Sequence, residues 1–176
     1  MRVSFNVDQI PFSVLTEAEK TLLLSRVQYK EFQPLQALIT AGKPSEGVFV
    51  IHQGRVAESE SGSHTDEQLM QQQSAFMHYQ TGEYFGSWSV FNGEAIHNFI
   101  AVETTICHLI PTETLLELID SNSLFADYFQ RSLTAKREII AQHTSNSDMA
   151  DFMLARVVDI SIREPLIVEE GTSIEQ

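Results

Sequence analysis

Residues 82–90 (Gly-Glu-Tyr-Phe-Gly-Ser-Trp-Ser-Val) have the composition of a turn that could hold a phosphate. Glycines allow a tight turn, and a short helix after Gly86 would offer backbone N–H groups and the positive end of its dipole to an anion. Ser87 and Ser89 could donate hydroxyl hydrogen bonds, and Trp88 could stack on a base. These residue types therefore predict a site for a phosphate-bearing ligand.

The cation that such an anion normally requires is missing from this part of the chain. Residues 56–130 contain no Lys or Arg and 11 acidic residues, so no local guanidinium can pair with a phosphodiester. Residues 1–55 carry 6 basic and 5 acidic side chains, and residues 131–176 carry 5 and 8, which gives the net charge of −13. This acidity repels nucleic acids and anionic lipids, so neither is expected as a partner.

Length and composition bound the class of protein. The 176 residues, 43% of them apolar, suffice for one domain with a core, or for one domain plus a fragment. No apolar run reaches membrane-spanning length and the first residues lack the order of a signal peptide, so a cytoplasmic location is expected. The single cysteine, Cys107, lies in an apolar run and is expected to be a small core residue rather than a nucleophile.

The elements that must position the turn are short strands between helices. A capping-box spacing of Thr16 and Glu19 predicts a helix over 16–26. Residues 60–66 are expected to be a loop, and 68–73 a wandering strand or exposed connection. The predicted strands are 29–32, 38–40, 47–52, 55–59, 97–103 and 105–110, with Gly54 in a positive-φ hairpin turn.

Two further helices follow the strands. Residues 112–119 are expected to form a short helix with Thr112 as its N-cap, and residues 122–143 a longer one. The whole predicts an α+β fold, a small β jelly-roll barrel flanked by N-terminal and C-terminal helices. The polar residues 144–148 are expected to be a linker that ends a domain of residues 1–143.

This order of elements resembles the cyclic-nucleotide-binding domain over about residues 10–143. Val48-Phe49-Val50-Ile51-His52-Gln53-Gly54-Arg55-Val56 looks like a strand pair of that family with its turn, and Gly82-Glu83-Tyr84-Phe85-Gly86 like the entry to its phosphate-binding cassette. Ala101-Val102-Glu103-Thr104-Thr105 and Ile106-Cys107-His108-Leu109-Ile110-Pro111 look like the strands that follow. The resemblance implies a regulatory module that binds a nucleotide.

Several positions depart from the pattern that the resemblance implies. Ser87 stands where cyclic-nucleotide binders have a Glu for the ribose 2′-hydroxyl. The position of their phosphate-binding Arg falls on Ala95, Ile96 or His97, next to the acidic Glu94. Leu35 and Gln36 replace a usual Gly-Glu turn. Conventional binding of cyclic AMP is therefore not expected.

Each candidate side chain also has a purely structural interpretation. His97 could meet an anion when protonated, but a surface histidine at a strand end is the simpler expectation. Trp88 is expected to pack against the barrel, and Ser87 and Ser89 to cap the short helix. An aromatic stripe, Phe125 and Phe129, could close over a ligand, although packing against the barrel or a dimer partner accounts for it more simply.

The tail carries a second resemblance, because residues 157–175 are similar to the opening of a CBS domain. Residues 149–176 would then be the truncated start of that domain. The order of the two domains resembles a bacterial signalling family that continues with CBS repeats and a nucleotidyltransferase domain.

Three function classes follow from these observations. The first is a regulatory module whose phosphate-binding cassette departs from the family pattern, and it is expected to form a homodimer. The second is a genuine sensor of a nucleotide or other small ligand, which uses the Gly86–Ser89 backbone. The third, a metal-dependent cupin-type enzyme, lacks the necessary histidine spacing, so neither a metal nor another cofactor nor catalytic residues are expected. The candidate ligand-binding residues are Gly86, Ser87, Trp88, Ser89, His97 and Asn98.

Overall fold

The computed structural model describes residues 4–60 and 75–145. It divides the chain into two compact units, Met1–Arg131 and Ser132–Gln176, and each is described by itself. The first unit contains the sheets and the helices around them, whereas the described part of the second is the C-terminal portion of one helix. Of the loop expected at 60–66, residue 60 ends a strand and residues 61–66 lie outside the described residues. The expected strand or connection at 68–73 and the CBS-like tail also lie outside them.

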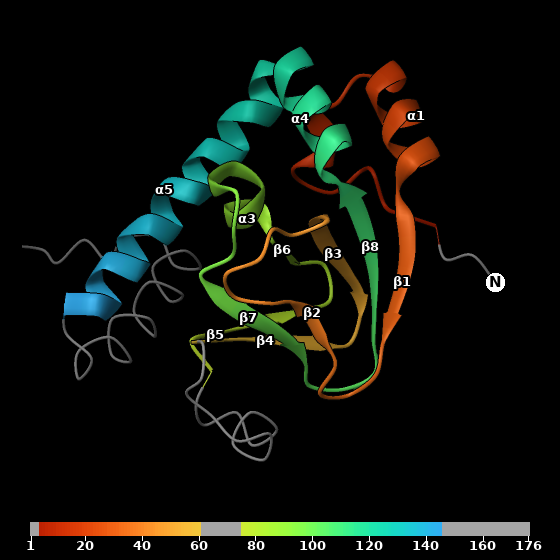
Figure 1. Cartoon of the computed structure of the whole chain (residues 1–176). Coiled ribbons are helices and arrows are strands. Elements are labelled where there is room, and N and C mark those ends of the chain that lie inside the picture. The colour runs from red at the N-terminus through yellow and green to blue at the C-terminus, as the bar shows by residue number, and fades with distance from the viewer. Residues whose placement is uncertain (1–3, 61–74, 146–176) are drawn as a thin grey trace, which may run out of the picture. The chain divides into compact units, whose positions relative to one another are not determined.

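The first unit is built on two four-stranded antiparallel sheets (Figure 1). One has the strand order β1-β8-β3-β6 and the other β2-β7-β4-β5. The strands are β1 (Gln28–Phe32), β2 (Ala37–Ile39), β3 (Gly47–Gln53), β4 (Arg55–Glu60), β5 (Met77–Gln80), β6 (Tyr84–Phe85), β7 (His97–Ala101) and β8 (Thr105–Pro111). Helices flank the sheets, so the expected α+β class is confirmed.

Strands β5 and β6 were not expected from the sequence. β5 has four residues and β6 has two, which is too few for a local pattern to be recognised without their partners β4 and β3. The Gly54 turn between β3 and β4 has the expected positive φ of 98°. Leu35, where the resemblance implies a glycine, also has a positive φ of 69°. The backbone therefore forms the turn even though leucine rarely adopts this conformation.

Two apolar clusters hold the unit together, and both include alternate residues of β3. Val48 and Val50 belong to a cluster with residues of the helices, whereas Phe49 and Ile51 belong to the cluster between the two sheets. Cys107 is fully buried in the second cluster, and burial raises the pKa of its thiol to about 12. Its expected role as a core residue is therefore confirmed.

The helices are η1 (Phe12–Val14), α1 (Glu17–Arg26), α3 (Ser87–Asn92), α4 (Thr112–Ser121) and α5 (Ser123–Ser145). The expectation that Thr112 is the N-cap of α4 was wrong, because Pro111 occupies that position. The Thr112 hydroxyl instead donates to the Glu46 carbonyl at 3.2 Å. Helix α5 extends through Ser145, so it includes the first two residues of the expected linker.

Glu19 links the start of α1 to the junction of α4 and α5. The Thr16 N–H donates to the Glu19 carboxylate at 2.8 Å, and the Glu19 N–H donates to the Thr16 hydroxyl at 3.3 Å, which confirms the capping box. The same carboxylate accepts from Asn122 Nδ2 at 2.9 Å and from the Ser121 hydroxyl at 2.8 Å. These hydrogen bonds, with that of Asn122 the largest contribution, lower the pKa of Glu19 to about 2.

The pH dependence of unfolding should report this linkage. Since the folded pKa lies below the ordinary value of 4.5, Glu19 stabilises the fold above pH 4.5 and loses this contribution as the pH falls towards 2. We expect Glu19→Gln to lower the free energy of unfolding by about 1 kcal/mol at neutral pH, and the difference from wild type to shrink below pH 4.5. Urea titrations over this pH range measure both quantities. The neighbouring Glu17→Gln is the control, and a loss independent of pH would contradict the assignment.

Candidate ligand-binding site

The turn singled out in the sequence lies between β6 and α3, at an edge strand of the first sheet. Gly86 has a φ of 96°, and a Cβ at this position would lie 2.8 Å from the Gly47 carbonyl oxygen and 3.1 Å from Ile39 Cδ1. Both the backbone angle and the close approach therefore require glycine. Gly93, with a φ of 89°, ends α3 after six residues.

The two serines of α3 do not cap the helix, so that interpretation was wrong. Gly86 is the N-cap and has no side chain to donate or accept. The Ser89 hydroxyl oxygen accepts from the Ser45 N–H at 2.7 Å and is buried. Ser87 is also buried, and within the described part of the chain its hydroxyl has no hydrogen-bond partner.

The loop between β2 and β3 joins the two groups of candidate residues. Besides the Ser45 contact with Ser89, the Gly42 N–H donates to the Ala95 carbonyl at 2.7 Å, and the Ala95 N–H donates to the Lys43 carbonyl at 2.9 Å. The Ala41 N–H donates to Asn98 Oδ1 at 2.9 Å. Asn98, a candidate from the sequence, thus holds the beginning of this loop.

Lys43 is the cation that this loop brings to the region. Its backbone pairs with Ala95, and its exposed side chain forms no ion pair with the residues that the structure describes. Lys43 was not among the cations expected near the turn from the sequence. A contact between residues 43 and 95 is too distant in sequence for any local pattern to reveal it.

His97 is buried, not at the surface as expected. Only 8% of the residue is exposed, and its Nδ1 lies 2.8 Å from Oε1 of Glu58, which is fully buried. Of the three positions considered for the missing arginine, Ala95 and His97 are buried whereas Ile96 is 37% exposed. Of the two buried positions, His97 is therefore the one that contacts a carboxylate, that of Glu58.

A third polar side chain completes this buried cluster. The Tyr79 hydroxyl donates to Oε2 of Glu58 at 2.6 Å, so the two carboxylate oxygens face donors from different strands. Burial, and then the Glu58 charge, raise the pKa of Tyr79 well above its ordinary value, so the phenol stays protonated. Glu58 and Tyr79 were not singled out in the sequence, where a single Glu in a strand gives no sign of burial.

Aromatic side chains fill the space between the sheets beside this cluster. The ring of Phe85 stacks on Phe49, with centroids 5.4 Å apart, and on Phe99 at 5.0 Å. Tyr79 contacts both Phe85 and Phe99. A ligand that entered between the sheets would have to displace these rings.

The remaining aromatic candidates differ in their surroundings. Trp88 is half-buried, and in the described part of the chain its indole makes no contact with another aromatic ring. Phe125 and Phe129 are fully buried in the cluster shared with Phe12 and Leu23. Packing within the domain therefore accounts for this pair, and neither ring is exposed to a dimer partner.

The fold and the glycine turn together define a regulatory domain of the cyclic-nucleotide-sensor type. The family model described as "Cyclic nucleotide-binding domain" matches residues 29–122, more than half of the chain. The chain therefore belongs to the cyclic-nucleotide-binding-domain family. No curated protein sequence matches it.

Solved structures support the same fold at low sequence identity. The regulatory subunit of a cAMP-independent protein kinase A from Trypanosoma brucei has a TM-score of 0.58 and 18% identity, over 72% of this chain and 44% of that one. The sensor domain of the transcriptional regulator DNR from Pseudomonas aeruginosa has a TM-score of 0.58 and 13% identity, over 71% and 85%. The Thermus thermophilus catabolite activator protein has a TM-score of 0.57 and 23% identity, over 80% and 62%. The chain thus spans less than half of the kinase subunit.

Replacing Gly86 should destabilise the domain more than replacing a glycine of similar φ in open space. Gly82 has a φ of 90°, and nothing lies within 4 Å of a Cβ placed there. We expect Gly86→Ala to lower the free energy of unfolding by about 2–4 kcal/mol and Gly82→Ala by about 1 kcal/mol. Urea denaturation of both variants measures the difference. Equal losses would contradict the close approach of Gly86 to Gly47.

Proposed function

We propose that this chain is a regulatory module that keeps the cyclic-nucleotide-binding fold but does not bind cyclic AMP or cyclic GMP through a conventional cassette. The pairing of His97 with the buried Glu58 carries the proposal. His97 is one of the three positions where the resemblance implies a phosphate-binding arginine, and its side chain already faces a carboxylate. A phosphate placed beside it would meet a negative charge that solvent does not screen.

Two further features support a departed cassette. Residues 56–130 contain no Lys or Arg, so a cation must come from elsewhere in the chain. The stacked rings of Phe49, Phe85 and Phe99 occupy the interior between the sheets. Loss of one charge-assisted hydrogen bond costs about 1.5–3 kcal/mol, and displacement of packed rings adds to this.

Two structural neighbours are consistent with this proposal. The trypanosome kinase subunit is described as cAMP-independent. A variant of it with three substitutions, one of which introduces an arginine, is described as bound to cAMP. In that protein, the same fold therefore occurs both in a cAMP-independent form and in a variant bound to cAMP. Substitutions in this chain can test the same difference.

A genuine ligand sensor is the second candidate function. Its support is the buried Ser87 hydroxyl, which lacks a partner in the described part of the chain, together with Lys43 on the adjoining loop. The ligand would then contact the Gly86–Ser89 backbone and Trp88 rather than an arginine. The cupin-type alternative has no comparable support, since the described residues contain no group of three or more side chains that could hold a metal.

The setting of the module in the cell also belongs to the proposal. We place it in the cytoplasm, as a homodimer formed through C-terminal helices and followed by CBS and nucleotidyltransferase domains. Its own role would be regulatory rather than catalytic. Among the described residues, no helix is long and apolar enough to cross a membrane.

Titration calorimetry tests the cassette directly. Since two anchoring contacts of about 1.5–3 kcal/mol each are missing, we expect no binding of cyclic AMP or cyclic GMP tighter than about 100 μM at neutral pH. Micromolar binding by the wild-type protein would contradict the departed cassette. It would favour the sensor alternative, and Lys43→Ala would then be the first variant to measure.

Reintroduced anchors sharpen this test. Ser87→Glu with His97→Arg alone should gain little, because Glu58 would pair with the introduced arginine. Addition of Glu58→Gln should free that arginine and raise the affinity for cyclic AMP by about tenfold or more. The matched control replaces His97→Arg by Ile96→Arg, which places the charge at the exposed neighbouring position. Equal affinities of the two sets of variants would mean that the inward position does not face the ligand.

Sedimentation tests the dimer. Leu133 and Ile140 are half-buried and seven residues apart on α5, so they lie on one stripe of the helix. We expect a dimer at micromolar concentration and its dissociation by Leu133→Glu, whereas Ala135→Glu, at an exposed position, should leave it intact. A monomer throughout this range would contradict self-association.

A further inference from the structure

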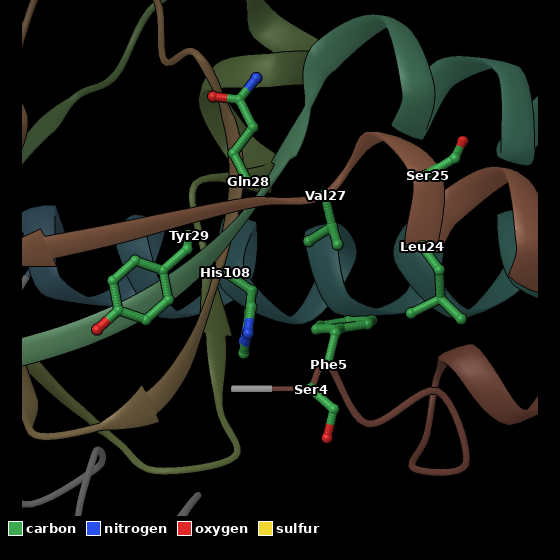
Figure 2. A pocket seen from close by; sticks show the side chains of 8 residues that line it. All are labelled: Ser4, Phe5, Leu24, Ser25, Val27, Gln28, Tyr29 and His108. Carbon is green, nitrogen blue, oxygen red and sulfur yellow. The ribbon is translucent and has the colours of Figure 1, made fainter. Parts of the chain in front are cut away.

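A pocket at the opposite edge of the first sheet from the candidate cassette is the starting point (Figure 2). Strand β1 forms one edge of the order β1-β8-β3-β6, and β6, which leads into the glycine turn, forms the other. The pocket has a volume of about 690 Å³, within the range of roughly 300–1,000 Å³ typical of small-molecule sites. Its walls come from the N-terminal segment, the end of α1, the start of β1 and one residue of β8.

One wall of the pocket is aromatic and held in place by packing. The Phe5 ring lies edge-on to Phe12 at 4.9 Å and to His108 at 5.2 Å, and His108 in turn contacts His52 at 5.6 Å. Phe5 and His108 are both buried. This wall therefore needs no rearrangement to receive a flat ligand.

The other walls expose apolar surface. Tyr29 lies directly across from His108 in the β1–β8 pairing and is 45% exposed, and Leu24 of α1 is 46% exposed. In the described part of the chain the Tyr29 ring touches no other aromatic ring. Figure 2 shows Leu24 on the same side of the pocket as Phe5, with Tyr29 near His108. An aromatic ring bound here would bury surface of both exposed side chains.

Apart from Tyr29 and His108, the polar side chains of the pocket are neutral. Ser4, Ser25 and Gln28 line it, and no Asp, Glu, Lys or Arg does so among the described residues. The Ser25 hydroxyl already donates to the Leu22 carbonyl at 2.7 Å, so it offers a ligand only an acceptor. The Gln28 amide can both donate and accept. An ionic ligand would find no carboxylate, ammonium or guanidinium group among the described lining residues, whereas a neutral ring with one or two polar atoms would fit them.

We infer that this pocket binds a small, uncharged molecule with an aromatic or heteroaromatic ring, placed between Phe5, Leu24 and Tyr29. This binding is independent of the cassette and of the proposed function. The ligand would contact β1 and β8, the strands that connect the pocket to the rest of the sheet.

Indole and indole-3-acetate form a matched pair of probes for this inference, since they share a ring and differ in charge. In ¹⁵N–¹H NMR titrations of the full chain we expect indole to produce saturable shifts at the amides of Gln28, Tyr29 and His108. The anion should bind about tenfold more weakly. Absence of saturable indole shifts at these amides would overturn the inference, and equal affinity for the anion would overturn the uncharged class.

Variants separate the pocket from non-specific binding. Leu24→Trp should fill the pocket and abolish the indole shifts, whereas Thr21→Trp, exposed on the same helix outside the lining, should not. Tyr29→Ala should weaken binding by about fivefold to tenfold and Tyr29→Phe should preserve it. Shifts that survive Leu24→Trp unchanged would overturn the assignment.

Discussion

The antiparallel pairing of β3 with β8 is the constraint on which the rest of the domain depends. Val48 faces Ile110 and Phe49 faces Leu109 in this register, so alternate residues of both strands supply the two apolar clusters. A slip by one residue would exchange the two sets of side chains and leave neither cluster intact. Gly47 permits the pairing at its start, because a Cβ there would collide with the Ile110 backbone.

The second sheet contains a buried charge that the first does not. Glu58 is fully enclosed, and its cost of burial is offset by donors from β5 and β7, the strands on either side of β4. The carboxylate therefore specifies how these three strands meet. The same hydrogen bond that satisfies Glu58 holds the His97 imidazole inside the domain.

The chain shares its fold with the cyclic-nucleotide-binding-domain family, but the ligand that such a fold binds depends on particular side chains. The glycine turn is held against the loop between β2 and β3 by backbone and serine hydrogen bonds. The charged groups near them are Lys43 on the loop and Glu58, which is paired with His97. The pocket beside β1 lies at the other edge of the same sheet, with β8 and β3 between it and β6. A ligand there and a ligand at the cassette would both contact this one sheet.

Local patterns in the sequence determined the α1 capping box, most of the strands, the Gly54 turn, the burial of Cys107 and the absence of a nearby cation. Each of these depends on residues within a few positions of one another, where spacing and turn chemistry act directly. Only the tertiary structure decided that His97 is buried, that Glu58 and Tyr79 accompany it, and that Lys43 adjoins Ala95. Those contacts join residues from 21 to 52 positions apart. Whether a polar side chain is buried depends on the strand that pairs beside it, and no local pattern specifies that strand.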